Sequence, residues 1–120
     1  HRGEMAELLE GKPIDLLTCQ AFCEEKKVTL VLKGAPTFIF HPKRDPLIVT
    51  KGDPGMATAG AGDVLTGIIG ALLAQKMDVR EAAVLGVYLH GLAGEIAASE
   101  MSSYSLMARD LIAFLPRTFL

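Results

Sequence analysis

The sequence has no tryptophan, few other aromatics, only two cysteines and almost balanced charge. A net charge of −2 with a pI near 5.9 argues against a nucleic-acid or anionic-membrane partner, because both need a basic surface. Cys19 and Cys23 lie four positions apart, with no second Cys or His pair at zinc spacing. We therefore predict reduced thiols, no metal site built by the protein, and a cytoplasmic location. The longest apolar run, residues 64–74, is interrupted and too short to span a bilayer, and no signal-peptide pattern opens the chain.

A loop of small residues, 51–62, runs directly into an apolar helical pattern. Gly60 and Gly62 leave the backbone accessible, and the first amides of a helix lack intrahelical acceptors, so this junction is suited to phosphate. Asp63 adds one carboxylate there. A carboxylate does not hold phosphate, so this position indicates a base that deprotonates a hydroxyl attacking phosphorus. The alternative is that Asp63 only caps the helix. The Walker pattern does not fit, because the chain has no Gly-x-x-x-x-Gly-Lys-Ser/Thr run. The dinucleotide pattern does not fit either, since Leu65 stands where its third glycine belongs.

Hydrophobic periodicity predicts helices flanking a small β region. The apolar residues 28–32 are typical of a strand that is covered on both faces. Because a predicted helix precedes this strand, the two are expected to form one α/β unit of a doubly wound sheet. The other predicted elements are helices at residues 1–10, 16–26, 64–75, 79–101 and 107–115 and a hairpin of strands 37–41 and 46–50. The helix over 64–75 is expected to be buried, with Gly67 and Gly70 allowing another backbone close. Because only one buried-type strand is present and no Met begins the chain, we expect the C-terminal part of something longer.

Two histidines and one lysine stand out by position. His41 leads the hairpin turn and is expected to face solvent. His90 lies inside a long apolar helix, where a packed and hydrogen-bonded side chain is the usual outcome. Lys33 follows the buried-type strand, where ligands bind in doubly wound sheets, although spacing alone favours a solvated strand end.

Four segments together resemble the C-terminal portion of ADP- or ATP-dependent NAD(P)H-hydrate dehydratases. The resemblance covers essentially the whole chain, and the third segment is the most specific. The segments are His1-x-Gly3-Glu4, Lys33-Gly34-Ala35-x-Thr37, the run from Gly55 to Ile69, and Ala108-x-Asp110-Leu111. The resemblance implies a ribokinase-like three-layer αβα sandwich, with residues 1–120 forming the C-terminal part of a single domain.

The resemblance also implies an activity, the nucleotide-dependent dehydration of (6S)-NAD(P)H hydrate, with Mg²⁺ and ADP or ATP as co-substrate. Asp63 would be the base, and Asp63 and His1 would face the hydrated nicotinamide. A homo-oligomer is implied as well, with no nucleic-acid or membrane partner. The implied nucleotide-binding residues are Lys33, Gly34, Ala35, Pro36 and Thr37, with the amides of Gly60, Ala61 and Gly62 around the phosphates.

Some positions depart from the family pattern, and two other functions compete. Arg2, Pro36 and Asp53 replace the usual Pro, Gly and Asn, and an extra carboxylate at Asp53 is expected to weaken nucleotide binding. A ribokinase-like kinase of a small vitamin-precursor alcohol would use the same base and stop at the phosphate ester. A non-catalytic nucleotide-binding or assembly module would instead use the helix glycines, such as Gly86 and Gly91, for packing between subunits.

Overall fold

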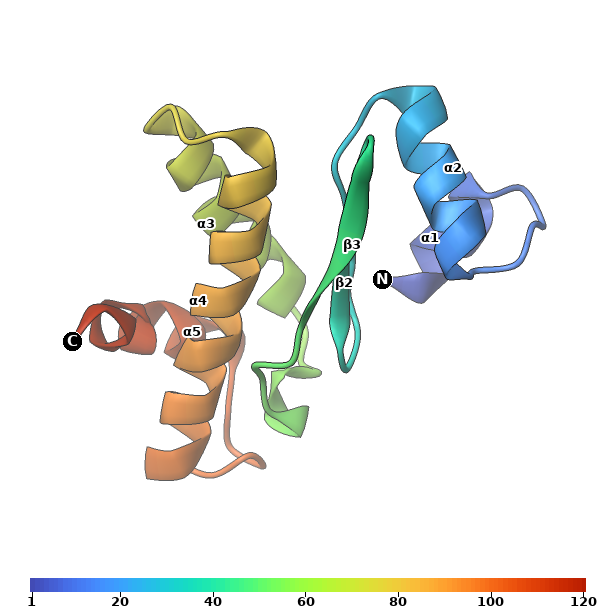
Figure 1. The fold of residues 1–120 in the computed structure, drawn as a ribbon. Coiled ribbons are helices and arrows are strands. Elements are labelled where there is room, and N and C mark those ends of the chain that lie inside the picture. The colour runs from blue at the N-terminus through green and yellow to red at the C-terminus, as the bar shows by residue number, and fades with distance from the viewer. The chain divides into compact units, whose positions relative to one another are not determined.

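The computed structural model describes all residues from His1 to Leu120, and the chain divides after Val49 into two units (Figure 1). The first unit, His1–Val49, contains α1 (Arg2–Leu8), α2 (Leu16–Lys26), β1 (Leu30–Leu32), β2 (Thr37–His41) and β3 (Arg44–Val49). The second unit, Thr50–Leu120, contains the 3₁₀ turn η1 (Pro54–Met56), α3 (Ala61–Ala74), α4 (Val79–Glu100), α5 (Ala108–Phe114) and the 3₁₀ segment η2 (Leu115–Phe119).

The first unit has a three-stranded sheet in the order β1-β2-β3, with both pairs antiparallel. Its alternate residues Leu30, Leu32, Phe38 and Phe40 pack with α1 and α2 into one apolar cluster. The prediction of a strand covered on both faces was wrong, because Leu30 and Val31 are only half-buried and the strand begins two residues later than expected.

The hairpin prediction is confirmed, with a tighter turn at Pro42 and Lys43. Lys43 is left-handed, with φ of 60°. Pro46, which cannot donate to a ladder, lies on the edge strand β3 beside an irregularity in its register.

The prediction that His41 faces solvent was wrong. Its ring Nδ1 lies 2.7 Å from the hydroxyl of Thr29, and the ring is half-buried. Its backbone carbonyl accepts a hydrogen bond from the Gln20 side chain at 2.9 Å. His41 therefore joins the start of β1 and α2 to the end of β2, which is a structural role.

In the second unit α4 is the central helix, packing against α3, α5 and η2 (Figure 1). A buried cluster of Ala61, Ala97, Leu106 and Leu111 joins α3, α4 and α5. Asp78 caps α4 by accepting the amide of Glu81 at 3.2 Å.

Helix α3 is less buried than its composition predicts. Only Ala61, Leu65 and Ile68 are buried, and nothing lies within 4 Å of a Cβ built at Gly67 or Gly70. The predictions of an all-round buried helix and of a close backbone approach at these glycines were therefore wrong for this structure.

Helix α4 is long and apolar enough, with 22 residues, to cross a bilayer by length and composition alone. Half of its apolar stretch is buried inside the structure. Buried core helices of globular proteins meet the same test, because they too are apolar on most sides. Its length and hydropathy are therefore weak evidence for a membrane span.

Candidate functional site

The glycine loop, residues 51–60, ends at Gly60, which directly precedes α3. Gly60 is the N-cap of α3 and has φ of 90°, a left-handed conformation that glycine adopts without steric cost. Its missing side chain also matters, because a Cβ there would lie 3.2 Å from the Cβ of Ala108. The conformation of Gly60 thus sets the direction in which α3 leaves the loop.

The start of α3 presents backbone amides that the helix itself cannot satisfy. The amide of Ala61 donates to the carbonyl of Thr58 at 3.2 Å, so it is already engaged. The amides of Gly62 and Asp63 occupy the next two positions of the first turn, where an α-helix has no acceptor for them. The helix dipole adds partial positive charge at this end, so an anion is favoured there.

Asp63 lies in the first turn of α3 and is exposed. The alternative that Asp63 caps the helix does not hold, because the N-cap is Gly60 and makes no side-chain cap hydrogen bond. Helix stability therefore does not require the Asp63 carboxylate as a cap. That carboxylate is available for chemistry beside the Gly62 and Asp63 amides.

Asp53 has a structural role in the same loop. It is the N-cap of η1, and its carboxylate accepts the amide of Gly55 at 2.8 Å. A Cβ at Gly55 would collide with the carbonyl oxygen of Ser103, so the turn also depends on glycine at that position. The Asp53 carboxylate is thus committed to shaping the loop.

The predicted residues 33–37 follow β1 in the first unit. The Thr37 hydroxyl donates to the Gly34 carbonyl at 3.1 Å and closes a small turn, which contains a cis peptide bond between Ala35 and Pro36. Gly34, Ala35 and Pro36 are exposed, and Lys33 is half-buried. The segment is therefore accessible to a ligand along its exposed part.

His1 lies in the same unit and caps α1. Its Nδ1 accepts the Glu4 amide at 3.3 Å, and the Glu4 carboxylate accepts from the backbone nitrogen of His1 at 2.8 Å, which completes a capping box. The contacts of His1 in this structure are thus local ones at the start of α1.

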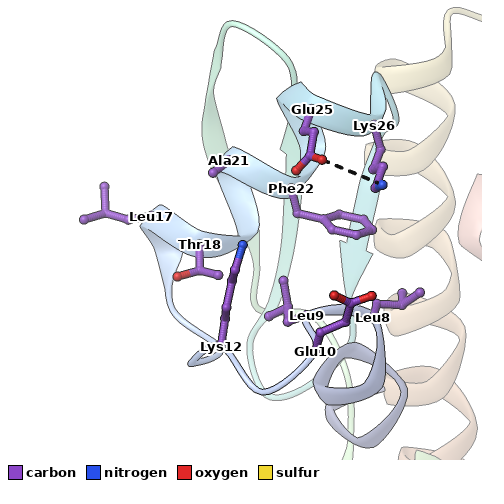
Figure 2. Close-up of a pocket in the computed structure, with 10 residues that line it drawn as sticks. All are labelled: Leu8, Leu9, Glu10, Lys12, Leu17, Thr18, Ala21, Phe22, Glu25 and Lys26. Atoms are coloured by element: carbon purple, nitrogen blue, oxygen red, sulfur yellow. Dashed lines mark ion pairs between the residues drawn. The ribbon is translucent and has the colours of Figure 1, made fainter.

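A groove of about 390 Å³ lies between α1 and α2 in the first unit (Figure 2). Apolar side chains such as Leu9, Leu17 and Phe22 line it, and the Glu25–Lys26 ion pair lies at its edge. None of the predicted site residues lines this groove. The hollow surface and the candidate anion site are thus separate features of the molecule.

The structure brings Gly60, Ala61, Gly62 and Asp63 together at one helix end and places His1 and residues 33–37 in the other unit. Sequence reasoning missed Glu95, whose carboxylate accepts the amide of Gly52 at 3.1 Å. The sequence gives no local signal for this contact, because the partners are 43 residues apart.

No group of three or more His, Cys, Asp or Glu side chains is arranged to hold a metal ion. Mg²⁺ is commonly bound through one or two carboxylates together with substrate phosphates and water. The single carboxylate of Asp63 beside the anion site fits an ion that arrives on a nucleotide, but it does not form a metal cage of its own.

The fold of the chain is ribokinase-like. It is similar to the ADP/ATP-dependent NAD(P)H-hydrate dehydratase of Bacillus subtilis crystallised with ATP and Mg²⁺, with a TM-score of 0.78 and 34% identity over 83% of this chain and 36% of that one. A ribokinase-like superfamily protein of Enterococcus faecalis gives a TM-score of 0.74 at 34% identity, covering 88% of this chain and 37% of that one.

Residues 1–117 match the family model described as NAD(P)H-hydrate dehydratase, and the chain belongs to that family. It is 47% identical over 97% of its length to a bifunctional NAD(P)H-hydrate repair enzyme of Moorella thermoacetica, of which it covers 23%. It is 36% identical over 97% of its length to the ADP-dependent (S)-NAD(P)H-hydrate dehydratase of Cenarchaeum symbiosum, of which it covers 42%. The chain thus spans less than half the length of these relatives.

Proposed function

We propose that this chain provides the phosphate-binding loop and catalytic base of an ADP- or ATP-dependent NAD(P)H-hydrate dehydratase. The observation that carries the proposal is Asp63, an exposed carboxylate in the first turn of α3 that is not used to cap the helix. Membership of the family supports the substrate class. We also propose that the protein is a cytoplasmic homo-oligomer and that both units belong to one ribokinase-like domain.

The proposed reaction has two steps. Asp63 accepts the proton of the C6 hydroxyl while that oxygen attacks the terminal phosphorus of the nucleotide, and the bond from that phosphorus to the nucleotide's bridging oxygen breaks. The ring nitrogen's lone pair then breaks the C6–O bond of the new phosphate ester and expels inorganic phosphate, and the neighbouring ring carbon loses a proton to solvent to give the dihydronicotinamide.

The residues of the chain have distinct roles in this reaction. The amides of Gly62 and Asp63 bind the transferring phosphoryl group, and residues 33–37 contact the adenine nucleotide. His1 contacts the nicotinamide part of the substrate. Mg²⁺ bound to the nucleotide would supply further positive charge at the phosphates, with Asp63 as the nearby carboxylate.

The test is Asp63→Asn in the protein that carries this chain. Turnover, followed as the appearance of reduced nicotinamide absorbance, is expected to fall by about 10²–10⁴-fold, the usual contribution of a general base. Nucleotide affinity, measured by calorimetry, is expected to stay within a few-fold, because the backbone amides remain.

Asp53→Asn is the matched control. Asn also caps turns, so the shape of the loop and the turnover are expected to persist. Retained turnover in Asp63→Asn would refute the assignment. Accumulation of a stable phosphorylated alcohol from another substrate, without NAD(P)H, would favour the kinase alternative.

A further inference from the structure

One face of α4 contacts the start and the middle of the glycine loop, and also Ala61, which directly follows the loop. His90, Gly91, Gly94 and Glu95 are spaced so that they share a side of the helix, and each meets a residue of the segment from Lys51 to Ala61. We propose that this face is the positioning surface of the phosphate site, with His90 and Glu95 as positioning residues. The expected effect of this surface on turnover rests on the proposed function, whereas its expected effect on the structure of the loop does not.

Glu95 holds the beginning of the loop. Its Oε1 accepts the amide of Gly52 at 3.1 Å, and its Oε2 lies 3.6 Å from the Lys51 ammonium. The pair is partly exposed, so the ion pair itself contributes little. The more specific contact is the backbone hydrogen bond, because it fixes where the main chain of the loop starts.

Two glycines let the loop come close to α4. A Cβ at Gly91 would collide with the carbonyl group of Lys51, which is backbone and cannot rotate away. A Cβ at Gly94 would collide with the thioether of Met56, the last residue of η1. The absence of a side chain at Gly91 therefore sets the distance between the helix and the start of the loop, whereas the flexible Met56 thioether fills the space that Gly94 leaves.

His90 holds the end of the loop, where α3 begins. Its Nε2 lies 3.0 Å from the carbonyl oxygen of Ala61, and the ring is buried. A carbonyl oxygen can only accept, so Nε2 carries the hydrogen in this contact. A buried polar side chain with a long-range backbone partner fixes geometry more specifically than an apolar side chain of similar size.

The position of Ala61 determines the position of the site. Ala61 is the first residue of α3, and the Gly62 amide and the Asp63 carboxylate follow it within the same turn. A displacement of Ala61 therefore moves both the anion-binding amides and the base. Misplacement of reacting groups by about 1 Å lowers rates by as much as about 10²-fold, so small shifts here matter.

The experiment compares His90→Leu with His90→Gln. Leu fills the space without a donor, whereas the Gln amide nitrogen reaches roughly the position of Nε2. Hydrogen exchange of the amides from Thr58 to Val64 is expected to accelerate about 2–10-fold in His90→Leu, the loss expected for one hydrogen bond, and to recover in His90→Gln. The kcat is expected to fall about 10–100-fold in His90→Leu with a smaller change in KM, and to recover in His90→Gln.

Substitutions at Glu95 test the same surface independently, in case His90→Leu fails to fold. Glu95→Gln keeps an acceptor for the Gly52 amide and is expected to retain loop protection, whereas Glu95→Leu is expected to lose it near Gly52. Gly70→Ala in α3 is the matched control, since nothing lies within 4 Å of the position that its new methyl group would take.

The outcomes separate the two proposals. If the unmodified protein binds nucleotide but shows no dehydratase turnover, the proposed function fails while exchange in the loop still tests the positioning surface. If folded His90→Leu and Glu95→Leu leave loop exchange unchanged, or if Gly70→Ala accelerates it equally, the positioning surface is refuted.

Discussion

Gly60 joins the loop to α3 in a left-handed conformation, with φ of 90°. A non-glycine residue there is penalised by about 1–2 kcal/mol, because its Cβ approaches the following carbonyl oxygen. The new methyl group would also press on Ala108, 3.2 Å away. We expect Gly60→Ala to lower the free energy of unfolding by at least that amount, measured by urea denaturation followed by circular dichroism.

Gly70 is the matched control for Gly60. It lies inside α3, and nothing lies within 4 Å of the position that a methyl group would take there. Gly70→Ala is expected to stabilise the protein by roughly 0.5–1 kcal/mol, since alanine is the better helix former. Equal effects of the two substitutions would show that the left-handed conformation of Gly60 carries no cost.

Single residues were predictable from the sequence when their partners are local or generic. The capping role of Asp15 on α2, through the Thr18 amide at 2.7 Å, follows from the pattern. The environment of His41 could not be predicted, because its partner Thr29 precedes β1 and only strand pairing brings the two together. Glu95 was missed for the same reason.

At the scale of elements, α2 turns two thiols toward the sheet of the first unit. Cys19 and Cys23 are both fully buried and form no disulfide. Burial raises the pKa of both thiols above the ordinary value of 9.0. Since the unfolded chain releases these protons at lower pH, their contribution to stability is complete below about pH 9 and is lost as pH rises through the folded pKa values.

We therefore expect the free energy of unfolding to fall as pH rises above about 9. Urea titrations from neutral pH upward measure this slope, and the double variant Cys19→Ala, Cys23→Ala should show a shallower one. Iodoacetamide should modify the native thiols far more slowly than those of the urea-unfolded chain. An identical pH slope in the double variant would contradict this account.

Helix boundaries were predictable where the hydrophobic period is clear, as for α2, α4 and α5. The start of α3 was placed three residues late, because Ala61 and Gly62 read as loop residues. The first turn of a helix tolerates glycine when the N-cap fixes the direction of the chain, and Gly60 does so here. This shift places Asp63 in the first turn instead of before the helix.

At the scale of the molecule, motif resemblance predicted the family and the ribokinase-like fold, and the comparisons confirm both. The antiparallel pairing of β1 with β2 could not be predicted, because the residue pattern of a short apolar strand does not depend on the direction of its neighbour. The adenine-nucleotide and substrate roles of His1 and residues 33–37 stay predictions. They depend on ligand contacts that the pattern of residues alone does not specify.

Helix α4 gives the last prediction, which concerns the whole molecule in the presence of membranes. Its length and hydropathy permit a membrane span, yet a span would remove Ala82, Leu89 and Ala97 from their buried sites. It would also place Glu95 in hydrocarbon, at a cost of about 2.5–3.5 kcal/mol or more for a charged side chain. We expect the folded chain to remain at the bottom of a density gradient when floated with neutral or anionic vesicles. A net charge of −2 gives no attraction to the anionic ones, and co-flotation with either kind would contradict this prediction.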